Sequence, residues 1–113
     1  MPKGRYLAEF ELYVMLAVAQ LGDDAYGVSV RREIEERTSR TVSIGAVYAT
    51  LGRLGAKGMV DDRISKPLPV PGGRSRKLWS LTEAGELALA HSARMLDRMR
   101  EGLDFRGDEL VAP

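Results

Sequence analysis

Apolar residues recur at helical spacing in four stretches of this chain, and polar residues or glycines separate the stretches. In the first, residues 9–21, one face carries Phe10, Val14, Ala17, Val18 and Leu21, and neighbouring apolar residues widen it. A helix that is apolar on nearly all sides is predicted to be buried in a core or at a subunit interface. Gly22 is suited to end it. A second helix is predicted over about 28–38, with Val30 and Ile34 pointing inward.

The third stretch begins at Ser43, a residue type that caps helices, and runs to about Lys57, with Gly58 at its end. Its predicted inward face is Ile44, Val47, Leu51 and Leu54. Three glycines lie inside this helix, and each costs about 1 kcal/mol of helix stability relative to alanine. We expect close approach to another backbone or to a ligand to account for some of them: Gly45, Gly52 and Gly55.

The fourth stretch follows a predicted hairpin. Strands are expected over 59–65 and 76–81, and the prolines and glycines of residues 66–73 exclude regular structure between them. Thr82 can cap a last helix over about 83–102. Its apolar stripe repeats every seven residues at Leu89, Leu96 and Leu103, more than a lone surface helix needs.

Composition removes many classes of function. The chain has 113 residues, the size of one domain, and its apolar stretches are far shorter than the roughly 20 residues of a membrane span. No secretion signal is recognised at the N-terminus. Without cysteine, and with His91 as the one histidine, the sequence excludes disulfides, thiol catalysis and zinc held by cysteines or several histidines. We expect no catalytic residue, metal site or cofactor, and so no enzyme.

Charge is unevenly distributed although the net charge is only +1. Residues 29–81 hold eleven Lys or Arg and five acids, a net +6, whereas residues 82–113 hold four Arg and seven acids, a net −3. A basic middle with an acidic tail indicates a local anionic partner.

The predicted order of three helices, strand, basic loop, strand and long helix is that of a winged helix-turn-helix, a mainly α fold with a small β-hairpin. In this fold the third helix enters a DNA major groove and the hairpin, or wing, carries cations to phosphates or the minor groove. We therefore expect a winged helix-turn-helix DNA-binding domain in residues 1–81 and a C-terminal dimerisation helix with an acidic tail in residues 82–113.

Three motifs in order resemble the PadR-like family of transcriptional regulators. They are Tyr26-Gly27, the run from Ser43 to Leu54 followed by Lys57 to Val60, and the run from Gly73 to Gly85. The chain departs from the family pattern at Trp79, where the family usually has tyrosine, at Gly55, and in its longer proline-rich wing tip. The resemblance covers about residues 9–90, and the single C-terminal helix resembles the short members.

The resemblance implies a cytoplasmic, homodimeric repressor whose first and last helices form the dimer interface and whose DNA binding is relieved by a small aromatic or drug-like effector. Its operator is expected to be palindromic, with two recognition helices in major grooves roughly 34 Å apart. We place at the interface Phe10, Val14, Leu89, Leu96, Met99 and Leu103. The residues expected to contact DNA are Ser43, Ala46, Tyr48, Thr50, Arg53, Lys57, Arg74, Arg76 and Lys77.

Several of these residues have a purely structural alternative. Tyr48 could be a packed core tyrosine, Lys57 a solvated cation at a helix end, and the wing cations a means of solubility. Trp79 is interpreted as packing between wing and core rather than as a ring that stacks on an effector. The alternative function is a winged helix that binds a protein and has lost DNA reading. His91 is expected to be structural or exposed.

Overall fold

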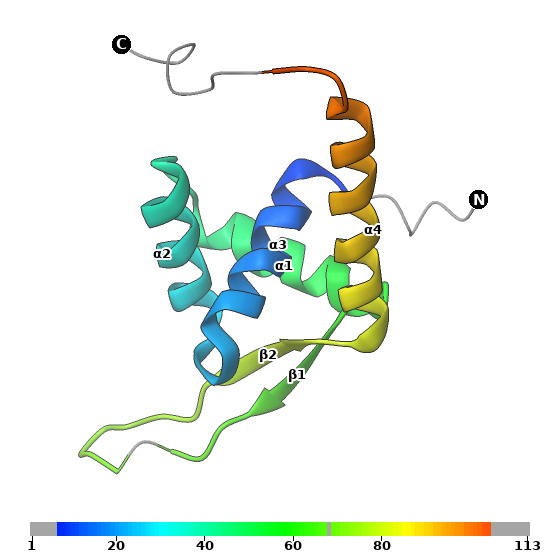
Figure 1. The fold of residues 1–113 in the computed structure, drawn as a ribbon. Helices are drawn as coiled ribbons and strands as arrows, with labels where there is room; N and C mark the ends of the chain where they lie inside the picture. The colour runs from blue at the N-terminus through cyan, green and yellow to red at the C-terminus, as the bar shows by residue number, and fades with distance from the viewer. Residues whose placement is uncertain (1–6, 68, 105–113) are drawn as a thin grey trace.

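The computed structural model describes residues 7–67 and 69–104. Within them the chain forms, in order, α1 (Glu9–Leu21), a 3₁₀ turn η2 (Gly22–Asp24), α2 (Gly27–Thr38), α3 (Ile44–Ala56), β1 (Val60–Ile64), β2 (Lys77–Leu81) and α4 (Glu83–Arg100) (Figure 1). The predicted element order is confirmed, and the fold is the mainly α winged helix-turn-helix that the sequence indicated.

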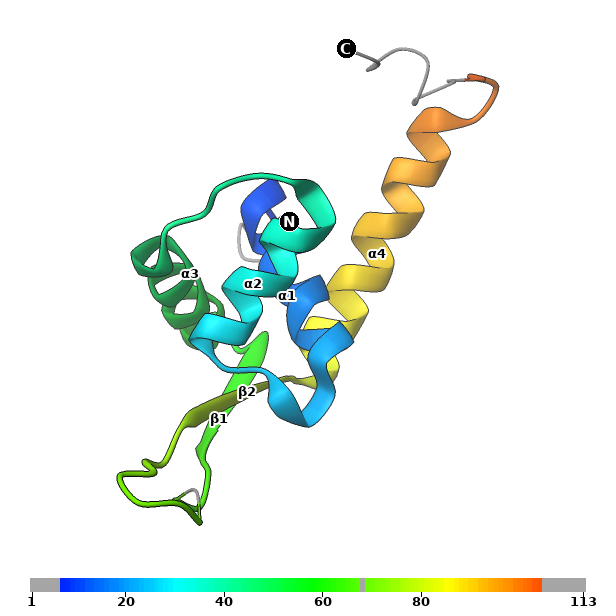
Figure 2. The same cartoon turned by 90° about the vertical axis from the view of Figure 1, so that its left-hand side faces the viewer.

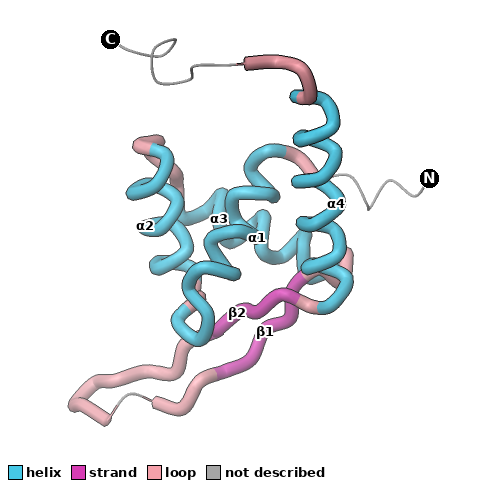
Figure 3. The backbone as a smooth tube through the Cα atoms, in the orientation of Figure 1, coloured by secondary structure: helices cyan, strands magenta, loops and turns pink. Residues whose placement is uncertain are grey.

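Helix α1 lies at the centre and contacts α2, α3, α4 and β2. The hairpin of β1 and β2 runs beneath the helices, and its long loop extends away from them (Figure 3). After a turn of 90°, α3 and the hairpin loop lie on one side of the molecule and the free end of α4 on the other (Figure 2). The body thus carries two projections, a wing and a helix, that point in different directions.

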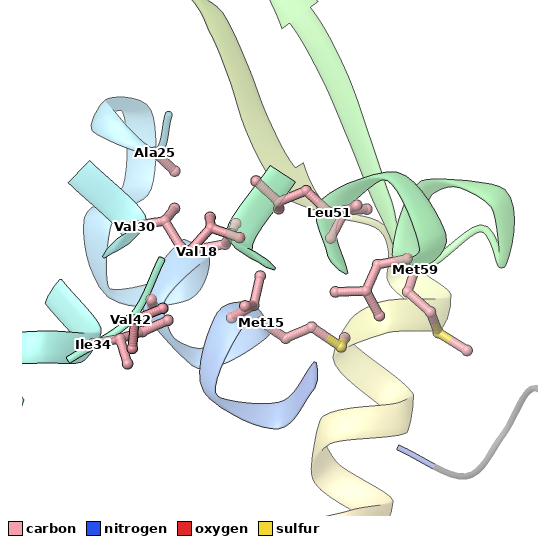
Figure 4. Close-up of a cluster of buried hydrophobic side chains, with 13 residues drawn as sticks. Met15, Val18, Ala25, Val30, Ile34, Val42, Leu51 and Met59 are labelled. Atoms are coloured by element: carbon pink, nitrogen blue, oxygen red, sulfur yellow. The ribbon is translucent and has the colours of Figure 1, made fainter. Parts of the chain in front are cut away.

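One hydrophobic core joins the elements (Figure 4). Its members are apolar residues spaced three or four apart on each helix, as burial of one helix face requires. The fully buried side chains with the largest volumes include Met15, Val14 and Val18 of α1, Val30 of α2, and Val47, Leu51 and Leu54 of α3. Ile44, also expected to point inward, is only half-buried. Val14 has no exposed surface within one protomer, so its expected place at the dimer interface is wrong.

Hydroxyl groups cap two helices as predicted. The Ser43 hydroxyl oxygen accepts a hydrogen bond from the Ala46 amide at 3.1 Å, at the start of α3. The Thr82 hydroxyl oxygen accepts from the Gly85 amide at 3.0 Å, at the start of α4. Each bond satisfies one of the amides that a helix start leaves without a partner.

Gly85 is required where α4 meets the end of α3 and the first strand. The Thr82 amide donates to the Met59 carbonyl at 3.0 Å, which brings the first turn of α4 against that backbone. A Cβ atom at Gly85 would lie 3.0 Å from the Met59 carbonyl carbon and 3.3 Å from Met15 Cε. The glycine therefore allows a close approach between two backbones, which fixes the angle at which α4 leaves the body.

The strands pair antiparallel, with Val60 opposite Leu81 and Ile64 opposite Lys77. Beyond β1, the Ser65 amide donates to the Arg76 carbonyl at 2.8 Å, so pairing continues one residue past the strands. The Trp79 amide donates to the Ala25 carbonyl at 2.7 Å and fastens β2 to the turn between α1 and α2. The root of the wing is thereby fixed to the helical body.

Element boundaries differ from the sequence expectations by one or two residues. The α2 helix begins at Gly27 instead of 28, the strands span 60–64 and 77–81 instead of 59–65 and 76–81, and α4 ends at Arg100 instead of 102. The turn η2, where Gly22 has φ +57°, was not predicted. The expected acidic tail after residue 104 lies outside the described residues.

Candidate nucleic-acid interface

The outer face of α3 consists mostly of small residues. Glycine or alanine occupies five of its exposed positions, and the polar exceptions are Ser43 at the cap, Tyr48 and Arg53. A Cβ atom at Gly45 or Gly52 would meet nothing within 4 Å, so neither glycine is needed for packing inside the protomer. The small exposed positions are Gly45, Ala46, Ala49, Gly52 and Ala56. A flat helix face of this kind allows another surface to come close to the backbone.

Thr50 was expected to face the DNA, and the structure corrects this. Its side chain is 1% exposed, and its hydroxyl oxygen accepts a hydrogen bond from Arg53 Nη2 at 3.0 Å. The spacing from Val47 and to Leu54 places Thr50 on the inward face of α3. Thr50 can therefore act only through the orientation of the Arg53 guanidinium.

Tyr48 is 53% exposed, and its ring lies across the first turn of α2. A Cβ atom at Gly27 would come within 2.8 Å of the Tyr48 hydroxyl oxygen and closer still to the ring. The absence of a side chain at Gly27 is thus what lets Tyr48 rest on α2. Two separate motifs of the sequence, Tyr26-Gly27 and the third-helix run, meet here in one contact.

Lys57 forms an ion pair with Glu11 of α1. Its Nζ donates to Glu11 Oε2 at 2.8 Å, while the Ala8 amide donates to Oε1 at 3.0 Å. Burial alone would raise the pKa of Glu11, but the hydrogen bonds from Lys57 and Ala8 and the charges of Lys57 and Arg53 outweigh it and lower the pKa. Lys57 therefore holds α3 against α1, and its expected role as a free DNA contact is corrected.

The sequence contains a signal for this ion pair, although the pair was not among the predicted contacts. Glu11 precedes Val14 and Val18 by three and seven residues, which puts its carboxylate on the core face of α1. A charged residue at such a position needs a partner, because an unpaired buried charge costs several kcal/mol. The partner could not be identified in advance, because it lies 46 residues further along the chain.

The three wing cations that are expected to contact DNA have different surroundings. Arg76 places its guanidinium 4.3 Å from the ring centroid of Tyr26, a cation–π contact. Lys77 lies 3.5 Å from Asp62 Oδ2 and 5.8 Å from the ring centroid of Trp79. Arg74 is exposed, and in the described part of the chain it has neither an ion pair nor a cation–π contact.

Trp79 packs against the hydrophobic core at the root of the wing, as the sequence interpretation held. On α3 it meets Gly55, where a Cβ atom would lie 3.7 Å from Trp79 Cζ3. On the η2 side, Arg63 Nη2 reaches Asp23 Oδ1 at 3.4 Å across exposed surface. The wing is therefore positioned by a backbone hydrogen bond, a packed indole and surface charge pairs.

Apart from Val14, the residues expected at the interface divide into two groups. Phe10 and Leu89 are partly buried and pack against the core of their own protomer. Leu96, Met99 and Leu103 are 56%, 79% and 58% exposed, on or just beyond the part of α4 that leaves the body. Two further exposed apolar side chains on these helices, Leu16 of α1 and Leu87 of α4, were not among the residues expected at the interface.

A shallow groove of about 240 Å³ lies between α1 and α2. Leu16, Ala17 and Ile34 supply apolar surface, and Glu33 and Arg37 stand at its polar side. His91 of α4 is partly buried and lies away from this groove's lining. In residues 7–67 and 69–104, no three His, Asp or Glu side chains gather in a way that could hold a metal ion.

Comparison with known proteins agrees with this geometry. The family model described as the transcriptional regulator PadR-like family matches residues 15–91. A PadR-like transcription factor from Bacteroides fragilis superposes with a TM-score of 0.65 at 22% identity, over 81% of this chain and 84% of that one. A PadR family transcription regulator from Clostridium difficile gives a TM-score of 0.61 at 22% identity, over 79% and 93%.

The Aeropyrum pernix ORC1 protein, in a structure of its complex with DNA, gives a TM-score of 0.61 at 23% identity, over 85% of this chain and 27% of that one. No curated protein matches the sequence significantly. No helix in the described residues has the length and apolar character to cross a membrane.

The exposed third helix and the basic wing place the protein in the structural class of winged helix-turn-helix proteins. Because the family model spans most of the chain, the protein belongs to the PadR-like family of that class.

Proposed function

We propose that this protein is a homodimeric repressor that binds a palindromic DNA operator, in the cytoplasm, through α3 and the wing. The supporting observation is the exposed face of α3 beside a wing segment, residues 65–77, that holds four Lys or Arg and no acid. Such a segment is attracted to DNA phosphates, and its binding releases the counterions that are condensed on the DNA. The contacts proposed for DNA are Ser43, Ala46, Tyr48, Arg53, Arg74, Arg76 and Lys77.

The second part of the proposal concerns the dimer. Helix α4 has one buried residue, Gly85, while its stripe of exposed apolar side chains remains open to solvent. Apolar patches of this kind usually mark an interface. We propose that residues 82–113 form the dimerisation segment, with Leu96, Met99 and Leu103 at its contact surface. Two heads joined in this way would meet major grooves on one side of a duplex about 34 Å apart.

An effector that relieves repression is the third part, and it rests on the family resemblance. Any such ligand must bind the DNA-free and DNA-bound arrangements with different affinity, since otherwise it shifts nothing. A small aromatic or drug-like molecule held near the dimer contact would change the spacing of the two heads. No cofactor or catalytic step enters this proposal.

One observation favours a second candidate, a winged helix that binds a protein. The outer face of α3 offers few hydrogen-bonding side chains for base edges, since most of its positions are glycine or alanine. A flat, small-residue helix face would also suit contact with another protein. The two candidates differ in salt dependence and in sequence preference on DNA.

The test is selection of bound sequences from a random duplex pool at two salt concentrations. We expect an inverted repeat to be enriched, with affinity falling by about a thousandfold or more between 50 and 200 mM salt if six or more phosphates are contacted. Sedimentation of the free protein should give a dimer. A folded protein that enriches no sequence and shows no salt dependence would exclude the repressor and favour the protein-binding alternative.

A further inference from the structure

Arg53 stands at the edge of the outer face of α3, one helical turn before Lys57. Its Nη2 donates to the Thr50 hydroxyl oxygen at 3.0 Å, and within the described residues its guanidinium forms no ion pair. A guanidinium carries several N–H donors, so most of them stay available to a base edge or a phosphate. Arg53 is thus anchored by a weak, neutral partner and is open to a stronger, charged one.

A buried carboxylate of α1 faces this same flank of α3. The side chain of Glu11 is 8% exposed, and its Oε2 accepts a hydrogen bond from Lys57 Nζ at 2.8 Å. Burial raises the pKa of Glu11, and one of the influences that lower it is the charge of Arg53, which makes no hydrogen bond to the carboxylate. Two cations, one turn apart on α3, therefore act on one carboxylate, but Lys57 holds it.

A carboxylate in this position does not remain without a partner, because an unpaired buried charge is strongly destabilising. A guanidinium matches the geometry of a carboxylate, and a charged acceptor binds it more strongly than a hydroxyl does. If Glu11 were left open, we expect Arg53 to exchange the Thr50 hydroxyl for the carboxylate. Its guanidinium would then turn away from the outer face of α3.

We infer that Lys57 is a positioning residue for DNA binding, which occupies the Glu11 carboxylate and thereby leaves the Arg53 guanidinium to DNA. Lys57 itself contacts no DNA in this arrangement. The inference rests on the proposed function and deepens it, because it makes an ion pair inside the protomer control a contact on the outer face of α3.

The test measures affinity for the selected operator, at a temperature where circular dichroism shows each variant folded. Lys57→Met keeps an unbranched side chain without the charge, and it should weaken binding by about tenfold, as much as Arg53→Ala does. Adding Glu11→Gln to Lys57→Met should restore affinity to within about threefold of the wild-type protein, because glutamine needs no cation and still accepts from the Ala8 amide.

These variants change the net charge, so a second background is needed. In Arg53→Ala, both Lys57→Met and Glu11→Gln should change affinity by less than about twofold, because the side chain they act through is gone. A general effect of charge would be the same in both backgrounds. Arg37→Met removes the cation of an ion pair with Glu33 on α2 and is the charge-matched control; it should keep affinity within about twofold.

A measurement on the free protein tests the exchange of partners without DNA. The Nε–H resonance of Arg53 in a nuclear magnetic resonance spectrum is the signal that Arg53→Ala lacks. It should shift in Lys57→Met, where the guanidinium binds a carboxylate, and return toward its wild-type position when Glu11→Gln is added.

Three outcomes would overturn the inference: wild-type affinity in Lys57→Met, an equal loss with and without Arg53, or an Arg53 resonance that does not move. If Lys57→Met does not fold, Lys57→Gln replaces it, because its amide can still donate to Glu11. The expected loss is then about threefold, and it should vanish in Arg53→Ala. Failure of the proposed function is distinguishable, because the wild-type protein would select no operator while the Arg53 resonance still responds.

Discussion

Helices α1 and α4 are both rich in apolar residues, but they use them in opposite ways. In α1, the side chains of Val14, Met15, Ala17 and Val18 are at most 3% exposed, so this face of the helix is enclosed by its own protomer, although Leu16 is 49% exposed. In α4 only Gly85 is buried, and Met99 near its far end is 79% exposed. The sequence of α1 completes a core, whereas the sequence of α4 provides a surface that has no counterpart within one chain. Apolar content by itself does not distinguish these roles.

The largest loss of stability should follow a substitution in the hydrophobic core that encloses α1. Leu51→Ala removes a fully buried side chain of the core, and it should lower the free energy of unfolding by about 2–5 kcal/mol. Urea denaturation followed by circular dichroism measures the change. Ala49→Ser, on the exposed side of the same helix, is the control and should change stability by less than about 0.5 kcal/mol. Equal losses in both variants would contradict the assigned faces of α3.

Substitutions in the exposed apolar surface of α4 should weaken dimer assembly and leave folding unchanged. Replacing both Leu96 and Met99 by glutamate puts charge on the exposed stripe, and the dimer dissociation constant should rise by about thirtyfold or more, as for interface hot spots. Sedimentation equilibrium measures it. The helical circular dichroism signal at a fixed concentration should persist, because these side chains are 56% and 79% exposed in their own protomer. An unchanged dimer would refute the proposed contact surface.

A smaller effect should be seen at the carboxylate of α1. The pKa of Glu11 is lower in the folded protein than its ordinary value of 4.5, so the stability it adds is present above that value and is lost as the pH falls through the folded pKa. Glu11→Gln should therefore cost about 1–2 kcal/mol at neutral pH and little in acid. Denaturation between pH 7 and pH 3 tests this, with Glu36→Gln as the exposed control.

The smallest expected change in stability concerns Gly27, which, like Gly85, lets another part of the chain come close to its backbone. At Gly85 an added Cβ would meet backbone, whereas at Gly27 it would meet the ring of Tyr48, a side chain that can rotate away. We expect Gly27→Ala to change stability by less than about 1 kcal/mol, because the Tyr48 ring can move. DNA affinity should fall severalfold, because the Tyr48 ring can no longer pack on Gly27 and leaves its position beside α2. In a Tyr48→Ala background the same change should have no further effect on affinity, and an undiminished loss there would disprove the coupling.

Local signals in the sequence were sufficient for most of the fold. Capping at Ser43 and Thr82, and the three-and-four spacing of apolar residues, located all four helices to within two residues. The faces were harder to assign. Thr50 was expected on the outer face of α3. It lies three residues after Val47 and four before Leu54, a spacing that already places it on the inward face. Val14 was misplaced because a helix that is apolar all round gives no sign of which side meets a partner.

The parts of the site that could not be predicted depend on contacts between distant residues. Lys57 pairs with Glu11 and so has a structural role, and Arg76, which stays among the proposed DNA contacts, also stacks on Tyr26. Nothing in the local pattern around either cation indicates its partner. Arg74 belongs to the same basic run as Arg76. Only the folded wing shows that Arg76 stacks on Tyr26 while Arg74 is exposed to solvent.

The chain contains a single tryptophan, and Trp79 sits at the root of the wing, half-buried against the core and fastened to Ala25 through its amide. The indole emission of the unmodified protein therefore arises from one place, the joint between the reading hairpin and the helical body. A change in the angle between the hairpin and the body alters the contact of that ring with Gly55 of α3, and with it the solvent around the ring. Fluorescence of the native protein can thus report the wing's position during a titration with DNA or with a small molecule, without any label.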